Sequence, residues 1–180
     1  MCEAYNYFLD ISAKVIQIIK RQGLRMIDLG GQFASPDGFE SVDLQGGDIT
    51  ADLSKEYPFE DNSIGCVRAF DFMEHIADKM HTLSEIHRVL TPGGILISMT
   101  PSTIGPDGLA GAGAFQDPTH CSYWNKNAFW YVTDPRLMKY ICNKKIKFQS
   151  LLLENSYLSD WHKGHNIPYV LAILKKETVL

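Results

Sequence analysis

Residues 64–99 carry the pattern that most constrains how this chain can fold. Two short apolar runs, at residues 64–70 and 95–99, flank a longer segment in which apolar residues recur every three or four positions. That spacing places side chains on one face of a helix, whereas short apolar runs bounded by turn residues are typical of buried strands. The recurring residues are Phe72, Ile76, Met80, Leu83, Ile86 and Leu90. A strand, a helix and a second strand in this order predict parallel neighbours joined by a right-handed crossover, and hence an α/β fold.

Both ends of this predicted helix carry recognisable signals. Asp71 is expected to be its N-cap, with Glu74 three positions later as in a capping box. The sequence Thr-Pro-Gly-Gly at residues 91–94 is expected to end the helix, because proline cannot continue it and the glycines free the following turn.

Further elements are expected before this unit. The chain begins with an amphipathic helix that Gly23 closes, and the apolar face of this helix packs either on the sheet or on a second copy of the chain. That face consists of Phe8, Ile11, Val15, Ile18 and Ile19. Residues 24–29 and 39–43 are expected to be short strands, each bounded by turn residues.

The last part of the chain predicts two short helices and two strands. The helices are expected at residues 127–132 and 135–141, after a glycine-rich loop at residues 100–114. The strands are expected at residues 146–153 and 168–174, the second of which begins with a proline.

The size and composition of the chain limit its function classes. Its 180 residues suit one domain, 1–180, with a sizeable core. A net charge of -4 argues against a nucleic-acid partner, because a phosphate backbone would be repelled. No apolar run approaches roughly 18 residues, and the N-terminus lacks a basic region followed by an apolar stretch, so neither a membrane span nor a secretory signal is expected. Four cysteines without a Cys-x-x-Cys pair suit reduced thiols in a cytoplasmic protein.

Three motifs within residues 24–100 resemble those of a known enzyme family. They are Pro-Phe-x-Asp-Asn-Ser at residues 58–63, Glu-His at 74–75 and Arg-Val-Leu-x-Pro-Gly-Gly at 88–94. Their order, after an Asp-x-Gly-Gly sequence and a Val-Asp sequence, resembles the type 11 group of class I methyltransferases, which use S-adenosyl-L-methionine. The resemblance implies a Rossmann-like methyltransferase fold, in which a mostly parallel sheet ends in a C-terminal antiparallel strand pair. It also implies methyl transfer from this cofactor to an oxygen or nitrogen of a small-molecule acceptor.

The ends of the predicted strands indicate which residues would bind the cofactor, because ligands of an open α/β sheet bind beyond the carboxyl ends of its strands. Gly30 and Gly31 follow the first strand and allow a ligand to approach the backbone closely. Asp43 ends the second strand, where a carboxylate can accept both ribose hydroxyls. The resemblance implies that Asp52 lies near the adenine amine. The other candidates are Asp28 at the end of the first strand and, facing the sulfonium, Phe70, Asp71 and Phe72.

The chain departs from the family pattern in its N-terminal half. The third glycine of the usual glycine motif is missing. Only 15 positions separate Asp28 from Asp43, which is too few for a full crossover helix and a strand. Residues 35–38, with the sequence Ser-Pro-Asp-Gly, predict a turn instead. The first crossover helix is therefore expected to be shortened or absent, and its loss would weaken one face of the cofactor pocket.

Two segments are expected to build the acceptor pocket, one after the glycine-rich loop and one between the last two strands. They contain His120, His162 and His165, whose imidazoles titrate near neutral pH and suit a general base. His120 and Asp117 are the preferred catalytic pair, because Asp117 and several aromatic residues surround His120 in the sequence. No fourth ligand accompanies the three histidines, so no metal site is expected.

Two other functions fit parts of the pattern. A noncatalytic interaction module would keep the fold while the trimmed pocket binds the cofactor poorly. A nicotinamide-dependent reductase shares the glycine and aspartate at the strand ends, but it requires a Gly-x-Gly-x-x-Gly motif that the chain lacks.

Overall fold

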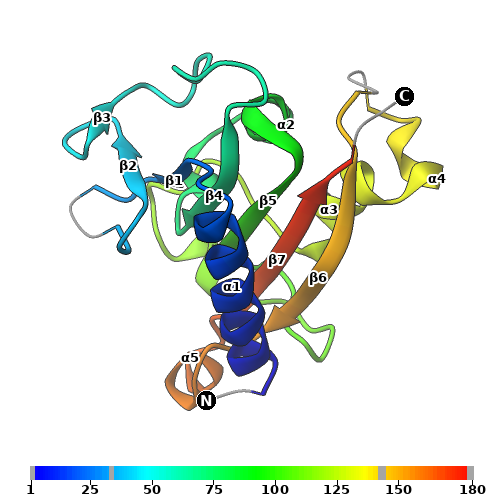
Figure 1. Cartoon of the computed structure of the whole chain (residues 1–180). Coiled ribbons are helices and arrows are strands. Elements are labelled where there is room, and N and C mark those ends of the chain that lie inside the picture. The colour runs from blue at the N-terminus through cyan, green and yellow to red at the C-terminus, as the bar shows by residue number, and fades with distance from the viewer. Residues whose placement is uncertain (1–2, 33–34, 142–144, 178–180) are drawn as a thin grey trace.

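The computed structural model describes residues 3–32, 35–141 and 145–177, and a seven-stranded sheet runs through it in the order β3-β2-β1-β4-β5-β7-β6 (Figure 1). Neighbours from β3 to β5 are parallel, β7 is antiparallel to β5, and β6 is antiparallel to β7. The strands are β1 (Met26–Leu29), β2 (Glu40–Asp43), β3 (Ile49–Thr50), β4 (Ile64–Phe70), β5 (Leu90–Pro101), β6 (Phe148–Ser156) and β7 (Tyr169–Lys176). The predicted mostly parallel sheet with a C-terminal antiparallel pair is confirmed.

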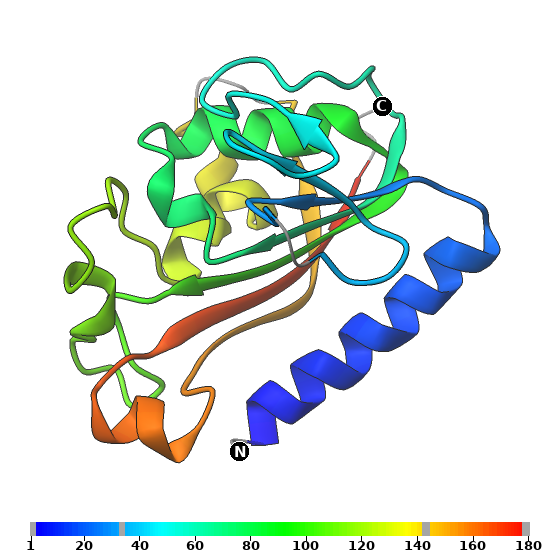
Figure 2. The ribbon, with the colours of Figure 1, turned by 90° about the vertical axis from the view of Figure 1, so that its left-hand side faces the viewer.

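Helices cover both faces of this sheet (Figure 2). The first helix, α1 (Glu3–Arg21), lies on one face, while α2 (Lys79–Val89) and α3 (Lys126–Thr133) lie on the other, and α4 (Pro135–Met138) follows α3 directly. The side chain of Phe8 is fully buried, and α1 contacts β4, β6 and β7. The apolar face of the first helix therefore packs on the sheet, which is one of the two alternatives that the sequence allowed, except for Ile18, whose side chain is exposed. None of the described helices is long and apolar enough to cross a membrane.

The N-terminal half of the sheet is trimmed, as predicted. Residues 30–39 alone connect β1 to its parallel neighbour β2, and the described part of this connection contains no helix. An even shorter connection, residues 44–48, leads from β2 to the parallel strand β3, which the sequence did not predict. The Asp48 carboxylate closes this connection by accepting hydrogen bonds from the backbone N–H and the hydroxyl of Ser41, at 2.8 and 2.9 Å. These bonds lower the pKa of Asp48.

The long helix does not begin at Asp71, so that part of the prediction is wrong. A short 3-10 helix, η1 (Met73–His75), follows β4, and α2 begins only after Asp78. The Asp78 side chain accepts hydrogen bonds from two backbone N–H groups of the first turn, both at 2.9 Å, and is thus the N-cap. The helix does end just before residues 91–94, at Val89 with Leu90 as its C-cap. These residues form no separate turn, however, because β5 starts at Leu90 and includes them, with a bulge against β4.

The C-terminal strands place one more segment at the carboxyl edge of the sheet. Because β6 is antiparallel to β7 and β7 to β5, β6 runs parallel to the core strands. The chain leaving β6 therefore turns at the edge where β1, β2 and β4 end. It forms a short helix there, α5 (Asp160–Gly164), which the sequence did not predict, and a second 3-10 helix, η2 (Gly113–Phe115), lies in the glycine-rich loop.

Candidate active site

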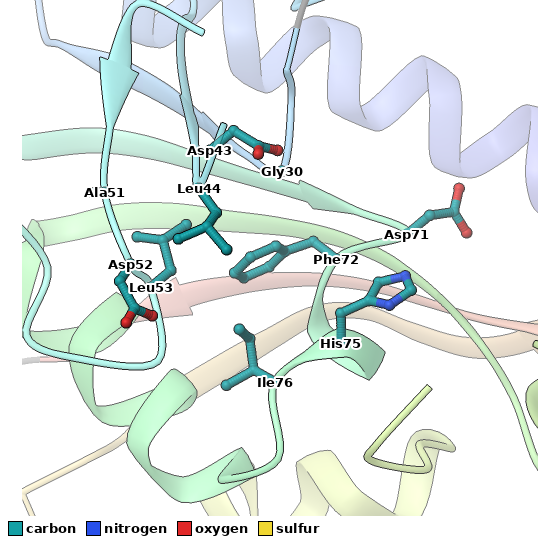
Figure 3. Close-up of a pocket in the computed structure, with 10 residues that line it drawn as sticks. All are labelled: Gly30, Asp43, Leu44, Ala51, Asp52, Leu53, Asp71, Phe72, His75 and Ile76. Atoms are coloured by element: carbon teal, nitrogen blue, oxygen red, sulfur yellow. The ribbon is translucent and has the colours of Figure 1, made fainter. Parts of the chain in front are cut away.

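A cavity of about 260 Å³ opens beyond the carboxyl ends of β1, β2 and β4 (Figure 3). Apolar side chains form its walls, and two carboxylates, Asp43 and Asp52, lie on the side that β2 and β3 contribute. Its lining residues are Gly30, Asp43, Leu44, Ala51, Asp52, Leu53, Asp71, Phe72, His75 and Ile76. Apolar walls with a few polar groups are typical of a site for a small organic ligand.

The two predicted acidic residues of this wall, Asp43 and Asp52, differ in how many hydrogen bonds and ion pairs their carboxylates already make. Asp43 Oδ1 accepts a hydrogen bond from the Gln45 N–H at 3.0 Å, which fixes the carboxylate at the end of β2 beside Gly30. Asp52 accepts hydrogen bonds from the hydroxyl and the N–H of Ser54, at 2.5 and 3.1 Å, and pairs with Lys55 at 3.0 Å. These contacts, the Ser54 hydroxyl foremost, lower the pKa of Asp52 to about 2. Asp43 is therefore the better placed of the two to accept ligand hydroxyls.

Gly30 is required by a neighbouring aromatic ring. Its φ is +74°, and a Cβ at this position would stand 3.0 Å from Cδ2 of Phe72. Figure 3 shows the Phe72 ring projecting into the cavity from the end of β4, toward Leu44. The close approach that the sequence assigned to a ligand is thus made here by the protein itself, and the cavity is what remains beside the ring.

Three other predicted residues lie behind the cavity wall. The Asp28 carboxylate is buried and binds Nη1 of Arg68 at 2.7 and 2.8 Å and the Ser35 hydroxyl at 2.9 Å, so it holds the loop after β1. Gly31 makes room for this contact, because a Cβ there would stand 2.6 Å from the Asp28 carboxylate. The Phe70 ring turns toward α1 and stacks under the Arg68 guanidinium at 3.8 Å. None of the three residues, Asp28, Gly31 and Phe70, lines the cavity.

A second cavity, of about 280 Å³, adjoins the first and shares Asp71 and His75 with it. It contains both residues of the predicted catalytic pair. The side chain of His120 is 7% exposed, and its Nε2 lies 3.9 Å from Oδ2 of Asp117. Its Nδ1 lies 2.9 Å from the carbonyl oxygen of Ala114. The lining residues are Asp71, Glu74, His75, Pro101, Gly113, Gln116, Asp117, His120, Ile167 and Tyr169.

Glu74 is a site residue that the sequence misplaced. It was expected in a capping box, but it lies in η1 with only 2% of its surface exposed. Its backbone carbonyl accepts hydrogen bonds from the N–H groups of Cys121 and Ser122, at 2.9 and 3.0 Å, which ties η1 to the segment that carries His120. Burial raises the pKa of Glu74 to about 7, and the nearby Asp71 carboxylate adds to the shift. The sequence signal that could have placed Glu74 in the site is the Glu-His pair shortly after the end of a predicted strand.

Asp71 marks the junction of the two cavities. Its φ of +47° turns the chain sharply after β4, and its N–H donates to the Met99 carbonyl at 2.9 Å. Burial raises the pKa of its carboxyl, while the Tyr169 hydroxyl and the imidazole of His75 act in the opposite direction. In Figure 3, Asp71 and His75 lie together at one end of the first cavity, far from Asp52.

The other two candidate bases lie outside both cavities. His162 and His165 belong to α5 or its C-cap, where Ser159 contacts Nδ1 of His162 at 2.8 Å and the Trp161 carbonyl contacts Nδ1 of His165 at 2.8 Å. The segment between the last two strands was expected to build the acceptor pocket, and only its residues after α5 do so, since Ile167 and Tyr169 line the second cavity.

Comparison with known families agrees with this geometry. A family model described as "Methyltransferase domain", of the type 11 group, matches residues 4–98, which is more than half of the chain. The chain belongs to the type 11 methyltransferase domain family. This methyltransferase domain is 35% identical over 66 residues to a "probable S-adenosylmethionine-dependent methyltransferase" of Mycolicibacterium smegmatis, a match covering 37% of the chain and 24% of that protein. The chain spans about a quarter, or less, of the length of the curated relatives it matches.

Solved methyltransferases share the fold of this domain. A SAM-dependent methyltransferase from Methanosarcina mazei superposes with a TM-score of 0.55 at 15% identity, over 86% of this chain and 93% of that one. Phosphoethanolamine N-methyltransferase 2 of Haemonchus contortus, solved with S-adenosylhomocysteine, gives a TM-score of 0.55 at 18% identity, over 93% of this chain and 53% of that one. At this identity the likeness shows the fold alone.

Proposed function

We propose that this methyltransferase domain transfers the methyl group of S-adenosyl-L-methionine to an oxygen or nitrogen atom of a small-molecule acceptor. The observation that carries the proposal is the pair of adjoining cavities, which share Asp71 and His75. A donor in the first cavity and an acceptor in the second would meet at these two residues. The cofactor would supply the reactive methyl group, so the protein has to position both partners and shape the charge around them.

The first cavity suits the nucleoside part of this cofactor. Leu44, Leu53 and Ile76 offer apolar surface for a flat base, and the Asp43 carboxylate stands where it can accept hydrogen bonds from ribose hydroxyls. Asp71 places a carboxylate at the end next to the acceptor, where it favours a positively charged sulfur. Phe72 limits the room between these groups.

The second cavity suits an acceptor that has to lose a proton. Nδ1 of His120 contacts a carbonyl oxygen, which can only accept a hydrogen bond, so the proton lies on Nδ1 and the lone pair on Nε2. Nε2 can then take a proton from the acceptor, and Asp117 at 3.9 Å stabilises the imidazolium that forms. A base of this kind contributes about 10²–10⁴-fold in rate, whereas positioning supplies up to roughly 7–11 kcal/mol of the barrier reduction.

The second candidate is a noncatalytic interaction module on the same fold. The missing crossover helix and the contact between Phe72 and Gly30 favour it, because both reduce the room for a nucleoside. Membership of the methyltransferase family removes the nicotinamide-dependent reductase from consideration.

Thermal unfolding with S-adenosylhomocysteine separates the two candidates. At about 100 times its dissociation constant, a ligand stabilises the native state by roughly 2.7 kcal/mol, which corresponds to a rise of roughly 5–10 °C in the melting temperature of a chain of this size. We expect this rise for the wild type and for Asp37→Ala, a change at an exposed aspartate outside the cavity, and its loss in Asp43→Ala. A wild type that shows no rise at millimolar ligand would favour the interaction module.

A further inference from the structure

We propose that Glu74, His75 and His120 form a binding site for a divalent transition-metal cation beside the acceptor cavity. Their ligand atoms all lie within 4.8 Å of one another, and Nε2 of His120 lies 3.9 Å from Oε1 of Glu74. Metal–ligand bonds of about 2.1 Å in a tetrahedral arrangement put ligand atoms about 3.4 Å apart. Small side-chain rotations would therefore close the three groups around a cation.

Glu74 supplies the observation that points to a missing ligand. Both of its carboxylate oxygens are buried, and neither has a hydrogen-bond partner of ordinary geometry within the part of the chain that the structure describes. The Thr100 hydroxyl, also buried without such a partner, is near enough to act toward a lower pKa of Glu74. A buried carboxylate without partners is costly, and proteins retain one chiefly where it is paired or coordinates a metal. Hydrogen bonds from the Cys121 and Ser122 N–H groups to its carbonyl hold the backbone of Glu74 beside the segment that carries His120.

The charges around Glu74 also favour a cation. The carboxylates of Asp71 and Asp117 are near enough to act on it electrostatically, and Asp117 lies 3.9 Å from His120. None of the residues that line this cavity is a lysine or an arginine. Three carboxylates, one of which (Asp71) also feels the Arg68 guanidinium, leave a net negative charge that attracts a doubly charged cation.

Both histidines are oriented as metal ligands are. Nδ1 of His120 contacts the Ala114 carbonyl at 2.9 Å, and Nδ1 of His75 contacts the carbonyl and the hydroxyl of Thr119, at 3.3 and 3.2 Å. The Thr119 hydroxyl donates its proton to Asp117 at 2.6 Å and a carbonyl can only accept, so in each ring Nδ1 carries the proton and Nε2 presents its lone pair. Histidines that bind metals usually donate their other ring N–H to a carbonyl or a carboxylate in this way.

The ligand types indicate which cations fit. Two imidazoles and one carboxylate suit Zn²⁺, Fe²⁺, Co²⁺ or Mn²⁺ better than Mg²⁺, which prefers oxygen ligands. Three protein ligands leave a coordination position open toward the cavity, as in catalytic rather than structural sites. The thiol of Cys121 lies 3.6 Å from the carbonyl of Glu74, so a thiolate is the competing ligand that an experiment has to exclude.

This site narrows the class of acceptor, a step that rests on the proposed methyltransferase function. An acceptor would bind the cation at this open position through an oxygen atom, and most firmly through a hydroxyl that stands next to a second oxygen atom. Nε2 of His120 would then hold the cation, and the cation itself would make the bound hydroxyl more acidic. His120 would thus be a metal ligand in the loaded protein in place of a free base.

Titration of the metal-free protein with Co²⁺ alone tests the site without any turnover. We expect one equivalent to produce the intense visible absorption of tetrahedral Co²⁺, without a thiolate charge-transfer band in the near ultraviolet. Glu74→Gln and His120→Asn should weaken Co²⁺ binding by about 100-fold or more, since each removes a direct ligand. His165→Asn is the matched control, because His165 also has Nδ1 on a carbonyl but belongs to no such cluster, and it should bind Co²⁺ like the wild type.

A second readout guards against variants that fail to fold. Glu74→Gln keeps the shape of the side chain and removes the buried charge, so its metal-free melting temperature should be equal to or above that of the wild type, while the rise with Co²⁺ is lost. Binding weaker than millimolar, wild-type binding by both ligand variants, or loss of the spectrum in Cys121→Ser would overturn the site. S-adenosylhomocysteine is titrated separately, so failure to bind it counts against the proposed function and leaves the metal result intact.

Discussion

The Phe72 ring lies against Gly30, with Cδ2 3.0 Å from the place where a Cβ on Gly30 would stand. This contact joins the end of β4 to the turn after β1 and sets the size of the cavity between them. The glycine thus serves two demands at once, a φ of +74° and the absence of a side chain.

Gly30→Ala should therefore lower stability more than a glycine change that meets only the first demand. Gly23 is the matched control, since its φ is +67° and nothing lies within 4 Å of its added Cβ. We expect Gly23→Ala to cost about 1–2 kcal/mol from the left-handed backbone. Gly30→Ala should cost more in urea unfolding, because the Phe72 ring also has to move. Equal losses in the two variants would show that the contact with Phe72 carries no strain.

The ion pair between Asp28 and Arg68 should contribute strongly to the stability of the fold. The Asp28 side chain is 1% exposed, so Arg68→Met would leave a buried carboxylate whose remaining side-chain partner, among the residues that the structure describes, is the Ser35 hydroxyl. We expect a loss of about 3–5 kcal/mol in the free energy of unfolding. The double variant Asp28→Asn/Arg68→Met should recover part of it, because the uncompensated charge is gone. If the double variant is no more stable than Arg68→Met, the loss comes from packing and not from charge.

His87 should make the domain less stable in mild acid. Burial, with the nearby Lys176 ammonium, lowers the pKa of His87 to about 4, whereas an unfolded chain has a histidine pKa of about 6.5. Between these values only the unfolded chain takes up the proton, so stability falls as the pH is lowered from about 6.5 to about 4. The measurement is urea unfolding from pH 7.5 to 4.5. His87→Gln should flatten the profile relative to the wild type, and His165→Gln, at an exposed position, should not; parallel profiles for all three would exclude His87 as the cause.

His120 should matter for turnover and not for cofactor binding. We expect His120→Gln to lower kcat by about 10²–10⁴-fold with any acceptor that supports release of S-adenosylhomocysteine. The rise in melting temperature with S-adenosylhomocysteine should stay that of the wild type, since His120 does not line the first cavity. Asp117→Asn should give a smaller loss, because Asp117 acts through His120 at 3.9 Å. An unchanged kcat in His120→Gln would remove this residue from the reaction.

Most of the sheet could be predicted because its strands are short apolar runs between turn residues. Residues 64–70 were predicted with the limits that β4 has. The start of α2 could not be predicted, because Phe72 and Ile76 continue the helical spacing through η1. In addition, Asp71 and Asp78 offer the same capping chemistry. The two-residue strand β3 depends on hydrogen bonds between Asp48 and Ser41. The spacing of apolar residues gives no sign of these bonds, so β3 could not be predicted.

Some residues of the candidate site could likewise be predicted from the sequence and others could not. That Asp43, Asp71 and Phe72 line the cavity could be predicted, because a strand end fixes where each stands. The role of Glu74 could not, since its burial depends on the distant segment that carries His120 folding over η1. The partners of Asp28 were equally hidden, because Arg68 meets it only across neighbouring strands of the sheet.

A crystal structure with S-adenosylhomocysteine bound tests the central claim most directly. We predict ribose hydroxyls on the Asp43 carboxylate, the adenine between the apolar walls near Asp52, and the sulfur facing Asp71 and His75. The account would be contradicted if, at saturating ligand, the cavity stayed empty with Phe72 still against Gly30, or if the nucleoside bound elsewhere on the protein.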